Sequence, residues 1–193
     1  MAWKGDSRAT FSGGSGQMAV MGELLHRKCN AAVPLVDVGM DVFAFQDDRE
    51  EVARIQVKTA RGSRYKKKRR GYSAKFGVPM DQLRRTSDPP LFYALAVRLE
   101  KAWGSFVVIS RMELLELAED GLGSKNEKSG DLELYIQFRP NAEGEDSGSG
   151  EAENEQELKA ICGEFDLTTY INAWESLPPL KPPVAINVDV PHA

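Results

Sequence analysis

The stretch Val52–Thr59, V-A-R-I-Q-V-K-T, decides the fold class that the sequence predicts. Every second residue in it is apolar or a threonine, in the order Ala53, Ile55, Val57 and Thr59. A period of two that is rich in β-branched residues indicates a β-strand. On such a strand Gln56 and Lys58 project from the same face, roughly 7 Å apart.

A second short strand is predicted just upstream, over the apolar residues Val42–Phe45, with Gly-Met-Asp41 leading into it. The polar run 46–51 joins the two strands and indicates a hairpin. Antiparallel pairing would bring Asp41 towards the later part of the second strand, where Gln56 and Lys58 lie. A carboxylate, an amide and a lysine would then line one pocket.

This order of motifs resembles the PD-(D/E)XK nuclease superfamily. Its members have a helix that often carries a glutamate, then a strand that begins at an aspartate, then a strand that carries Glu/Asp-X-Lys. Here Glu23, Asp41 and the tripeptide Gln56-Val57-Lys58 stand at those positions. The chain looks most like the branch of small uncharacterised domains that have Q-X-K in place of E-X-K. The resemblance covers about residues 17 to 110.

The resemblance implies an α/β fold, in which helices flank a mixed central β-sheet with an αβββαβ core and a C-terminal extension. The pattern of apolar residues, breaks and caps agrees with such a fold, although many α/β folds could produce it. The further elements that it predicts are a first helix over 17–29, strands over 72–76, 91–99, 106–109 and 132–138, a short helix over 79–86, a helix capped by Ser110 and a final helix over 166–177.

Composition divides the chain into four parts. Residues 1–16 are rich in Gly and Ser and are expected to form a flexible leader. Residues 17–140 would form the nuclease-like core. Residues 141–157 are acidic and rich in Gly and Ser, which is typical of a disordered loop. Residues 158–193 would form the C-terminal helix and an extended tail.

The resemblance also implies the site. Asp41, Gln56, Lys58 and Glu23 would be the catalytic residues. A hard divalent cation, Mg²⁺ or Mn²⁺, would be held by Asp41, Glu23, Gln56 and the backbone carbonyl of Val57. Two alternatives stay open from the residues themselves. Glu23 could instead pair with Arg27, four residues on along the helix, and Asp37 competes with Asp41 for the position of the catalytic aspartate.

Gln56 departs from the usual family pattern. Its neutral side chain lacks the charge with which a carboxylate attracts a metal ion, so we expect weaker metal binding. Two readings follow from this departure. The domain could retain activity, as some Q-X-K members do, or it could bind nucleic acid without cutting it.

A basic run follows the predicted Gln56 strand directly. Seven of the ten residues from 61 to 70 are Arg or Lys. A phosphate backbone could lie on them, and such binding would depend steeply on salt because counterions are released. The alternative is a solvated charge run without a ligand. The predicted nucleic-acid-binding residues are Arg61, Arg64, Lys66, Lys67, Lys68, Arg69 and Arg70.

Composition limits the other functions. The net charge is −4, so attraction to nucleic acid must be local. The two cysteines, Cys29 and Cys162, are too few for a disulfide framework or a zinc cluster and are typical of a cytoplasmic protein. No run of 18 apolar residues predicts a membrane span.

The sequence therefore predicts a metal-dependent endonuclease that hydrolyses phosphodiester bonds in DNA. A homodimer is compatible with this function, because nucleases that cut both strands are often dimers. The first alternative is a weak or inactive nuclease-fold module that binds nucleic acid or a protein partner. The second is an unrelated α/β interaction domain in which the Q-V-K motif is a coincidence.

Overall fold

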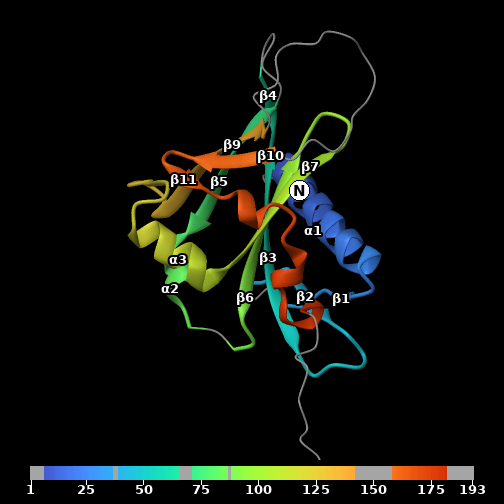
Figure 1. Cartoon of the computed structure of the whole chain (residues 1–193). Coiled ribbons are helices and arrows are strands. Elements are labelled where there is room, and N and C mark those ends of the chain that lie inside the picture. The colour runs from blue at the N-terminus through green and yellow to red at the C-terminus, as the bar shows by residue number, and fades with distance from the viewer. Residues whose placement is uncertain (1–6, 37–38, 66–70, 87, 142–157, 182–193) are drawn as a thin grey trace, which may run out of the picture.

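Two β-sheets pack against each other in the computed structural model, which describes residues 7–36, 39–65, 71–86, 88–141 and 158–181 (Figure 1). The first sheet has the strand order β1-β2-β3-β6-β7. It is mixed, because β3 pairs with β6 in parallel while its other pairs are antiparallel. Its strands are β1 (Asn30–Ala32), β2 (Val42–Phe45), β3 (Val52–Arg61), β6 (Leu91–Arg98) and β7 (Trp103–Ser110).

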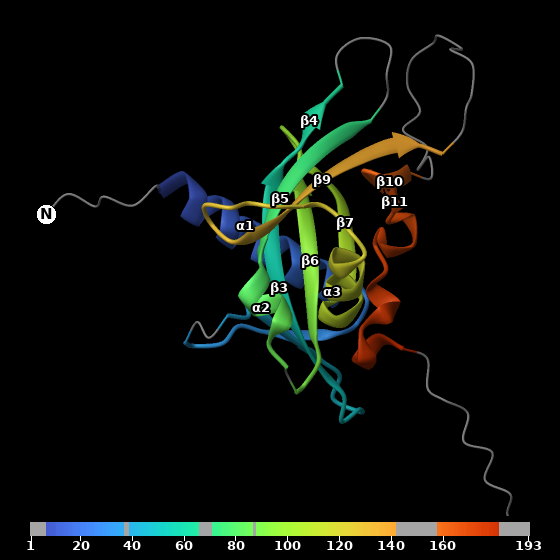
Figure 2. The ribbon, with the colours of Figure 1, turned by 90° about the vertical axis from the view of Figure 1, so that its left-hand side faces the viewer.

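The second sheet is antiparallel throughout and has the order β11-β10-β9-β5-β4, with β8 also paired to β9. Long pairing between β5 and β9 forms its centre (Figure 2). Its strands are β4 (Ser63–Arg64), β5 (Tyr72–Pro79), β8 (Ser124–Lys125), β9 (Asp131–Pro140), β10 (Leu158–Cys162) and β11 (Phe165–Asp166).

Three α-helices and three short 3₁₀ helices complete the described part of the chain. Helix α1 (Ser7–His26) covers one face of the first sheet, and the second sheet covers part of the other face together with α2 (Met80–Arg84) and α3 (Arg111–Glu119) (Figure 1). Apolar residues from both sheets share one core cluster, and α1 shares the other with the opposite face of the first sheet. The 3₁₀ helices are Thr168–Tyr170, Trp174–Ser176 and Pro178–Leu180.

The predicted hairpin is confirmed. Strands β2 and β3 pair antiparallel, with Val42 opposite Ile55 and Phe45 opposite Val52. Ala53, Ile55 and Val57 lie in the core beneath α1, as the alternation predicts. The capping box at the start of α3 is also confirmed, because the Ser110 hydroxyl accepts from the backbone N–H of Glu113.

The predicted fold class, a mixed β-sheet flanked by helices, is confirmed. The order α1-β2-β3-β5-α2-β6 follows the predicted helix, three strands, helix and strand. One strand differs in its place, because β5 pairs with β4 and β9 in the second sheet rather than joining the central one. The second sheet thus extends the fold on the side of β3 that carries Gln56.

The prediction of a flexible leader over 1–16 is wrong from Ser7 onwards, because α1 begins there. Gly16 explains why a Gly-rich segment is helical. It is buried against β3, and a Cβ atom at this position would lie 1.9 Å from the Thr59 Oγ1 atom. The missing side chain lets the helix approach the sheet closely, and this tertiary packing outweighs the low helix propensity of glycine.

The prediction of a final helix over 166–177 is also wrong. This segment runs along the edge of β7, where Ile171 bridges to Val107 and the Asn172 N–H donates to the Phe106 carbonyl over 2.8 Å. The Asn172 side chain also accepts from the Phe106 N–H, and its φ of +50° excludes a continuous α-helix. Trp174 is buried as expected, but in a 3₁₀ turn.

Several sequence predictions fall outside the described residues. These are the first six residues of the leader, Asp37, the basic residues 66–70, the acidic loop over 142–157 and the tail from 182. Cys29 and Cys162 are both buried free thiols. Within the described ranges, no helix combines the length and the apolar character that crossing a bilayer requires.

Candidate active site

Asp41 is held at the entrance to β2 from two sides. Its N–H donates to the Ile55 carbonyl over 2.9 Å, which extends the hairpin by one residue. Its own carbonyl accepts from the side-chain amide of Gln17 on α1 over 2.6 Å. The backbone of Asp41 is thus fixed between the sheet and the helix.

The Asp41 carboxylate meets the Q-V-K motif directly. Its Oδ2 atom accepts from Gln56 Nε2 over 2.5 Å and from the Val57 N–H over 2.7 Å. Hydrogen bonds of this kind to a charged group are shorter and stronger than neutral ones. The structure therefore brings together Asp41, Gln56 and the backbone of Val57, as the sequence predicts.

Gln56 is buried, with 8% of its surface exposed, and its amide has a defined orientation. Gln82 of α2 donates from Nε2 to Gln56 Oε1 over 2.9 Å. Because Gln56 Oε1 is the acceptor for Gln82, the Nε2 end of the same amide turns to Asp41. Gln56 thus serves Asp41 as a hydrogen-bond donor.

Gln82 is itself oriented by two further groups. Its Nε2 also donates to the Gly39 carbonyl over 2.6 Å, and its Oε1 accepts from the Tyr93 hydroxyl over 3.2 Å. Burial raises the pKa of Tyr93, so this phenol remains a donor at neutral pH. Neither Gln82 nor Tyr93 is among the site residues that the sequence predicts. Tyr93 is the one residue with a polar tip in the otherwise apolar run Leu91–Val97, which is the signal that could have revealed it.

Lys58 lies on the same face of β3 as Gln56. In the parallel pairing with β6, Gln56 lies beside Tyr93 and Lys58 beside Leu95, and both of these β6 residues belong to the core between the sheets. Lys58 is half-buried, and it has no ion pair or hydrogen bond among the described residues. A cation in such a position is available to an anionic substrate.

Glu23 is not brought to Asp41. Its carboxylate pairs with Arg27 over 2.6 Å, and the Arg27 guanidinium lies 5.4 Å from the centre of the Trp174 ring. Gln17 is the α1 residue that reaches Asp41, and Glu23 follows it by six residues, about 9 Å along the axis and on a different side of the helix. The structure therefore shows the alternative arrangement, in which Glu23 pairs with Arg27 four residues further along the helix.

The donor set at Asp41 limits how a metal ion could bind. Among the residues that the structure describes, no three His, Cys, Asp or Glu side chains cluster in a way that could hold a metal. The described residues of the site offer one carboxylate, amide oxygens and backbone carbonyls. These groups fit Mg²⁺ or Mn²⁺ only as an ion that completes its shell with water and substrate phosphate, as Mg²⁺ commonly does.

Two of the predicted nucleic-acid-binding residues are described, and both are exposed. Arg61 ends β3 and Arg64 lies in β4. The other five, Lys66 to Arg70, lie outside the described residues.

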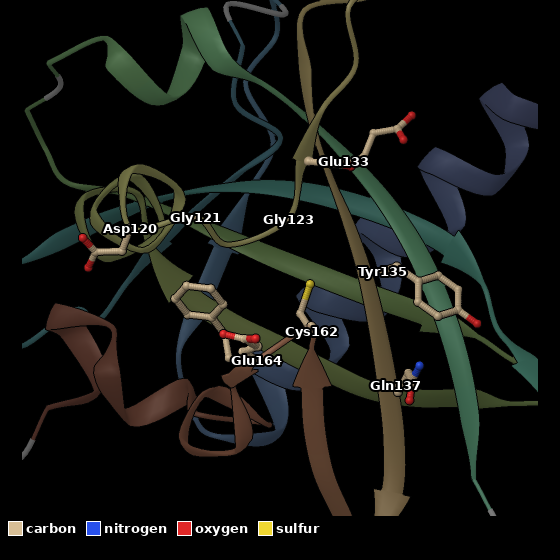
Figure 3. A pocket seen from close by; sticks show the side chains of 11 residues that line it. Asp120, Gly121, Gly123, Glu133, Tyr135, Gln137, Cys162 and Glu164 are labelled. Carbon is tan, nitrogen blue, oxygen red and sulfur yellow. The ribbon is translucent and has the colours of Figure 1, made fainter.

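A cavity of about 580 Å³ lies on the second sheet, away from Asp41 (Figure 3). Asp120, Glu133 and Glu164 line it, together with Cys162, whose pKa is raised by burial. No lysine or arginine is among the described residues that line it. Because this lining is acidic, the cavity would repel a phosphate, so it is not the candidate site.

Comparison with known proteins gives one structural likeness. No protein-family model matches the chain, and no curated protein matches it. Among solved structures, the bacterial homing endonuclease I-Ssp6803I aligns over 91% of each chain, with 15% sequence identity and a TM-score of 0.42.

Proposed function

We propose that this chain hydrolyses phosphodiester bonds in DNA with the help of a divalent cation. The observation that supports this most directly is the contact of Asp41 with Gln56 at 2.5 Å, with Lys58 on the same face two residues further along β3. Carboxylate and lysine in this spacing can serve metal-assisted attack on a phosphate.

Each residue has a separate task in this proposal. Asp41 would provide the charged ligand of Mg²⁺ or Mn²⁺, and the Val57 carbonyl a neutral one. The cation, when bound, would polarise the phosphate and lower the pKa of a bound water. Lys58 would orient the attacking water and offset the negative charge that develops on the phosphate. Glu23 has no part in it, because its carboxylate pairs with Arg27.

Gln56 takes a different role from the one that the family resemblance implies. As a donor to Asp41, it holds the carboxylate in one orientation. Its carbonyl oxygen is engaged by Gln82, so a metal ion would gain this ligand only if the amide turned over. We therefore assign Gln56 to the positioning of Asp41.

A second candidate function is a nuclease-fold module that binds nucleic acid without cutting it. The observation in its favour is that the described residues place a single carboxylate at the site and form no three-residue metal cluster. One carboxylate attracts a divalent cation more weakly than the paired acids of a typical metal nuclease.

Cleavage of plasmid, linear duplex and single-stranded DNA, with Mg²⁺ and Mn²⁺ titrated, tests the two functions. Asp41→Asn keeps the size of the side chain and removes its charge, and Lys58→Gln removes the amine. Two matched surface controls are Asp81→Asn in α2, whose carboxylate pairs with Arg85 just beyond that helix, and the exposed Lys101→Gln. All four variants would first be compared by circular dichroism.

We expect cleavage that both site variants lose and both surface controls keep. DNA binding without cleavage in the parent protein would instead support the second function. Cleavage that survives in Asp41→Asn would contradict the proposed catalytic site, whatever its metal dependence.

A further inference from the structure

Two arginines lie side by side where the parallel strands of the central sheet end. Arg61 of β3 and Arg98 of β6 are direct partners in the register, and the next residue, Gly62, donates its N–H to the Arg98 carbonyl over 2.9 Å. Neighbouring strands are about 4.8 Å apart, and paired residues project to the same face. Like charges that are adjacent in this way repel each other.

Both arginines belong to the face that α1 covers. Arg61 projects to the same side of β3 as Val57, and Arg98 to the same side of β6 as Ala94 and Ala96. Val57, Ala94 and Ala96 are buried in the core beneath α1. Ser12 of α1, one helical turn before Gly16, lines a cavity together with them. This cavity has a volume of about 300 Å³, and the described residues that line it are Ser12, Arg61, Arg98, Leu99 and Glu100.

The charge of this pair is not compensated within the part of the chain that the structure describes. Neither Arg61 nor Arg98 makes an ion pair or a side-chain hydrogen bond there, although Glu100 lines the same cavity. Arg27 and Arg85, by contrast, both pair with acids four residues away. Guanidinium groups bind the oxygens of a phosphate in a bidentate manner, so two of them over one cavity suit a phosphate.

We propose that Arg61 and Arg98, with Ser12, bind a backbone phosphate of the polynucleotide that is cut at Asp41. This inference rests on the proposed function and adds a defined anchor point to it. Arg61 lies three residues beyond Lys58, about 10 Å along β3, and its side chain projects from the opposite face of the strand. The polynucleotide would therefore pass around the edge of β3, and the anchored phosphate would lie more than three nucleotide steps from the one at Asp41. Arg98 lies outside the basic run that the sequence singles out.

The test measures binding of a fluorescently labelled DNA duplex over a range of salt concentrations, in EDTA so that no cleavage occurs. The variants are Arg61→Gln, Arg98→Gln and the double variant. Lys125→Gln is the charge-matched control, because this exposed lysine lies in β8 of the second sheet. We expect each arginine variant to reduce the slope of log affinity against log salt by about 0.9, and the control to leave it unchanged.

A second arm uses inorganic phosphate and the melting temperature. Phosphate should stabilise the parent and Lys125→Gln, and should stabilise neither arginine variant. Normal DNA binding with an unchanged salt slope in Arg98→Gln would overturn the arginine site and leave the proposed function standing. If the parent binds no DNA while phosphate still stabilises it through the two arginines, the proposal that the ligand of this site is a polynucleotide is wrong.

Discussion

Gln82 donates its side-chain amide to Gln56 Oε1 over 2.9 Å, and this contact determines which end of the Gln56 amide meets Asp41. Without it, Gln56 could present either its oxygen or its nitrogen to the carboxylate. An oxygen facing the carboxylate would repel it, whereas the nitrogen donates a hydrogen bond. Gln82 is thus a positioning residue, which acts on the site through Gln56.

Replacing Gln82 by alanine tests this relationship. Each lost hydrogen bond contributes about 1 kcal/mol, so we expect the melting temperature to fall by several degrees. We also expect cleavage to become roughly tenfold slower, at the cost of about 1.4 kcal/mol in the barrier, because Asp41 loses its fixed orientation. The control is Gln46→Ala in the β2–β3 turn, which removes a surface contact to the Lys28 carbonyl. Equal cleavage rates for Gln82→Ala and the parent would make Gln82 structural only.

Replacing Gln56 by glutamate introduces a second acid and puts two carboxylates where a donor and an acceptor now lie 2.5 Å apart. We expect a loss of about 2 kcal/mol of stability in EDTA, because a hydrogen bond to a charged group becomes a repulsion. Mg²⁺ should restore the stability, since two carboxylates bind a hard cation better than one. The measurement is the melting temperature with EDTA and with Mg²⁺.

The double variant Asp41→Asn, Gln56→Glu is the matched control for that experiment. It exchanges donor and acceptor and again leaves one carboxylate at the site. In EDTA, the double variant should lose less stability than the sum of the losses of the two single variants, because the two residues are in contact. Additive losses would show that the Asp41–Gln56 contact contributes nothing to folding.

The sequence was sufficient to predict the contact between Asp41 and Gln56 because both residues belong to one hairpin. Alternation fixes the face of β3, and the short β2–β3 connection fixes the direction of the partner strand. Gln82 and Tyr93 belong to α2 and β6, and their approach to Gln56 depends on the parallel pairing of β3 with β6. Nothing local in the sequence specifies that pairing.

The α1 residue at the site illustrates the same limit. Periodicity predicts which side of a helix is buried, but not which turn of the helix crosses a given strand. Gln17, rather than Glu23, reaches Asp41 because Gly16 sets the point of closest approach, at Thr59. A glycine within a helix is read locally as a flexible residue, and its role in close packing becomes visible only with the sheet in place.

Two glycines of α1 should respond to alanine in opposite ways. Gly16→Ala would bring a methyl group to 1.9 Å from the stiff, β-branched Thr59 side chain, so the helix or the strand must shift. We expect a net loss of more than about 1 kcal/mol, because overpacking costs more than alanine adds in helix propensity. Gly14→Ala meets no atom within 4 Å and should stabilise the protein by up to about 1 kcal/mol. Chemical denaturation measures both, and a stabilising Gly16→Ala would contradict the close packing of α1.

Tyr93→Phe should change the alkaline stability of the protein. The pKa of Tyr93 is raised above its ordinary value of 10.0, chiefly by burial, with opposing effects of Arg111 and Asp81. Below about pH 10 the phenol is protonated in both states, so its contribution to stability is complete. Above that pH the unfolded chain ionises first, so stability is lost as the pH rises.

We expect Tyr93→Phe to lower stability at neutral pH by about 1 kcal/mol, because Gln82 Oε1 loses its donor. Since phenylalanine cannot ionise, the melting temperatures of the parent and the variant should converge above about pH 10. The parent curve also contains Tyr170, whose pKa is raised as well, so only the difference between the two proteins isolates Tyr93. A difference that stays constant from neutral to alkaline pH would show that the buried phenol does not couple folding to ionisation.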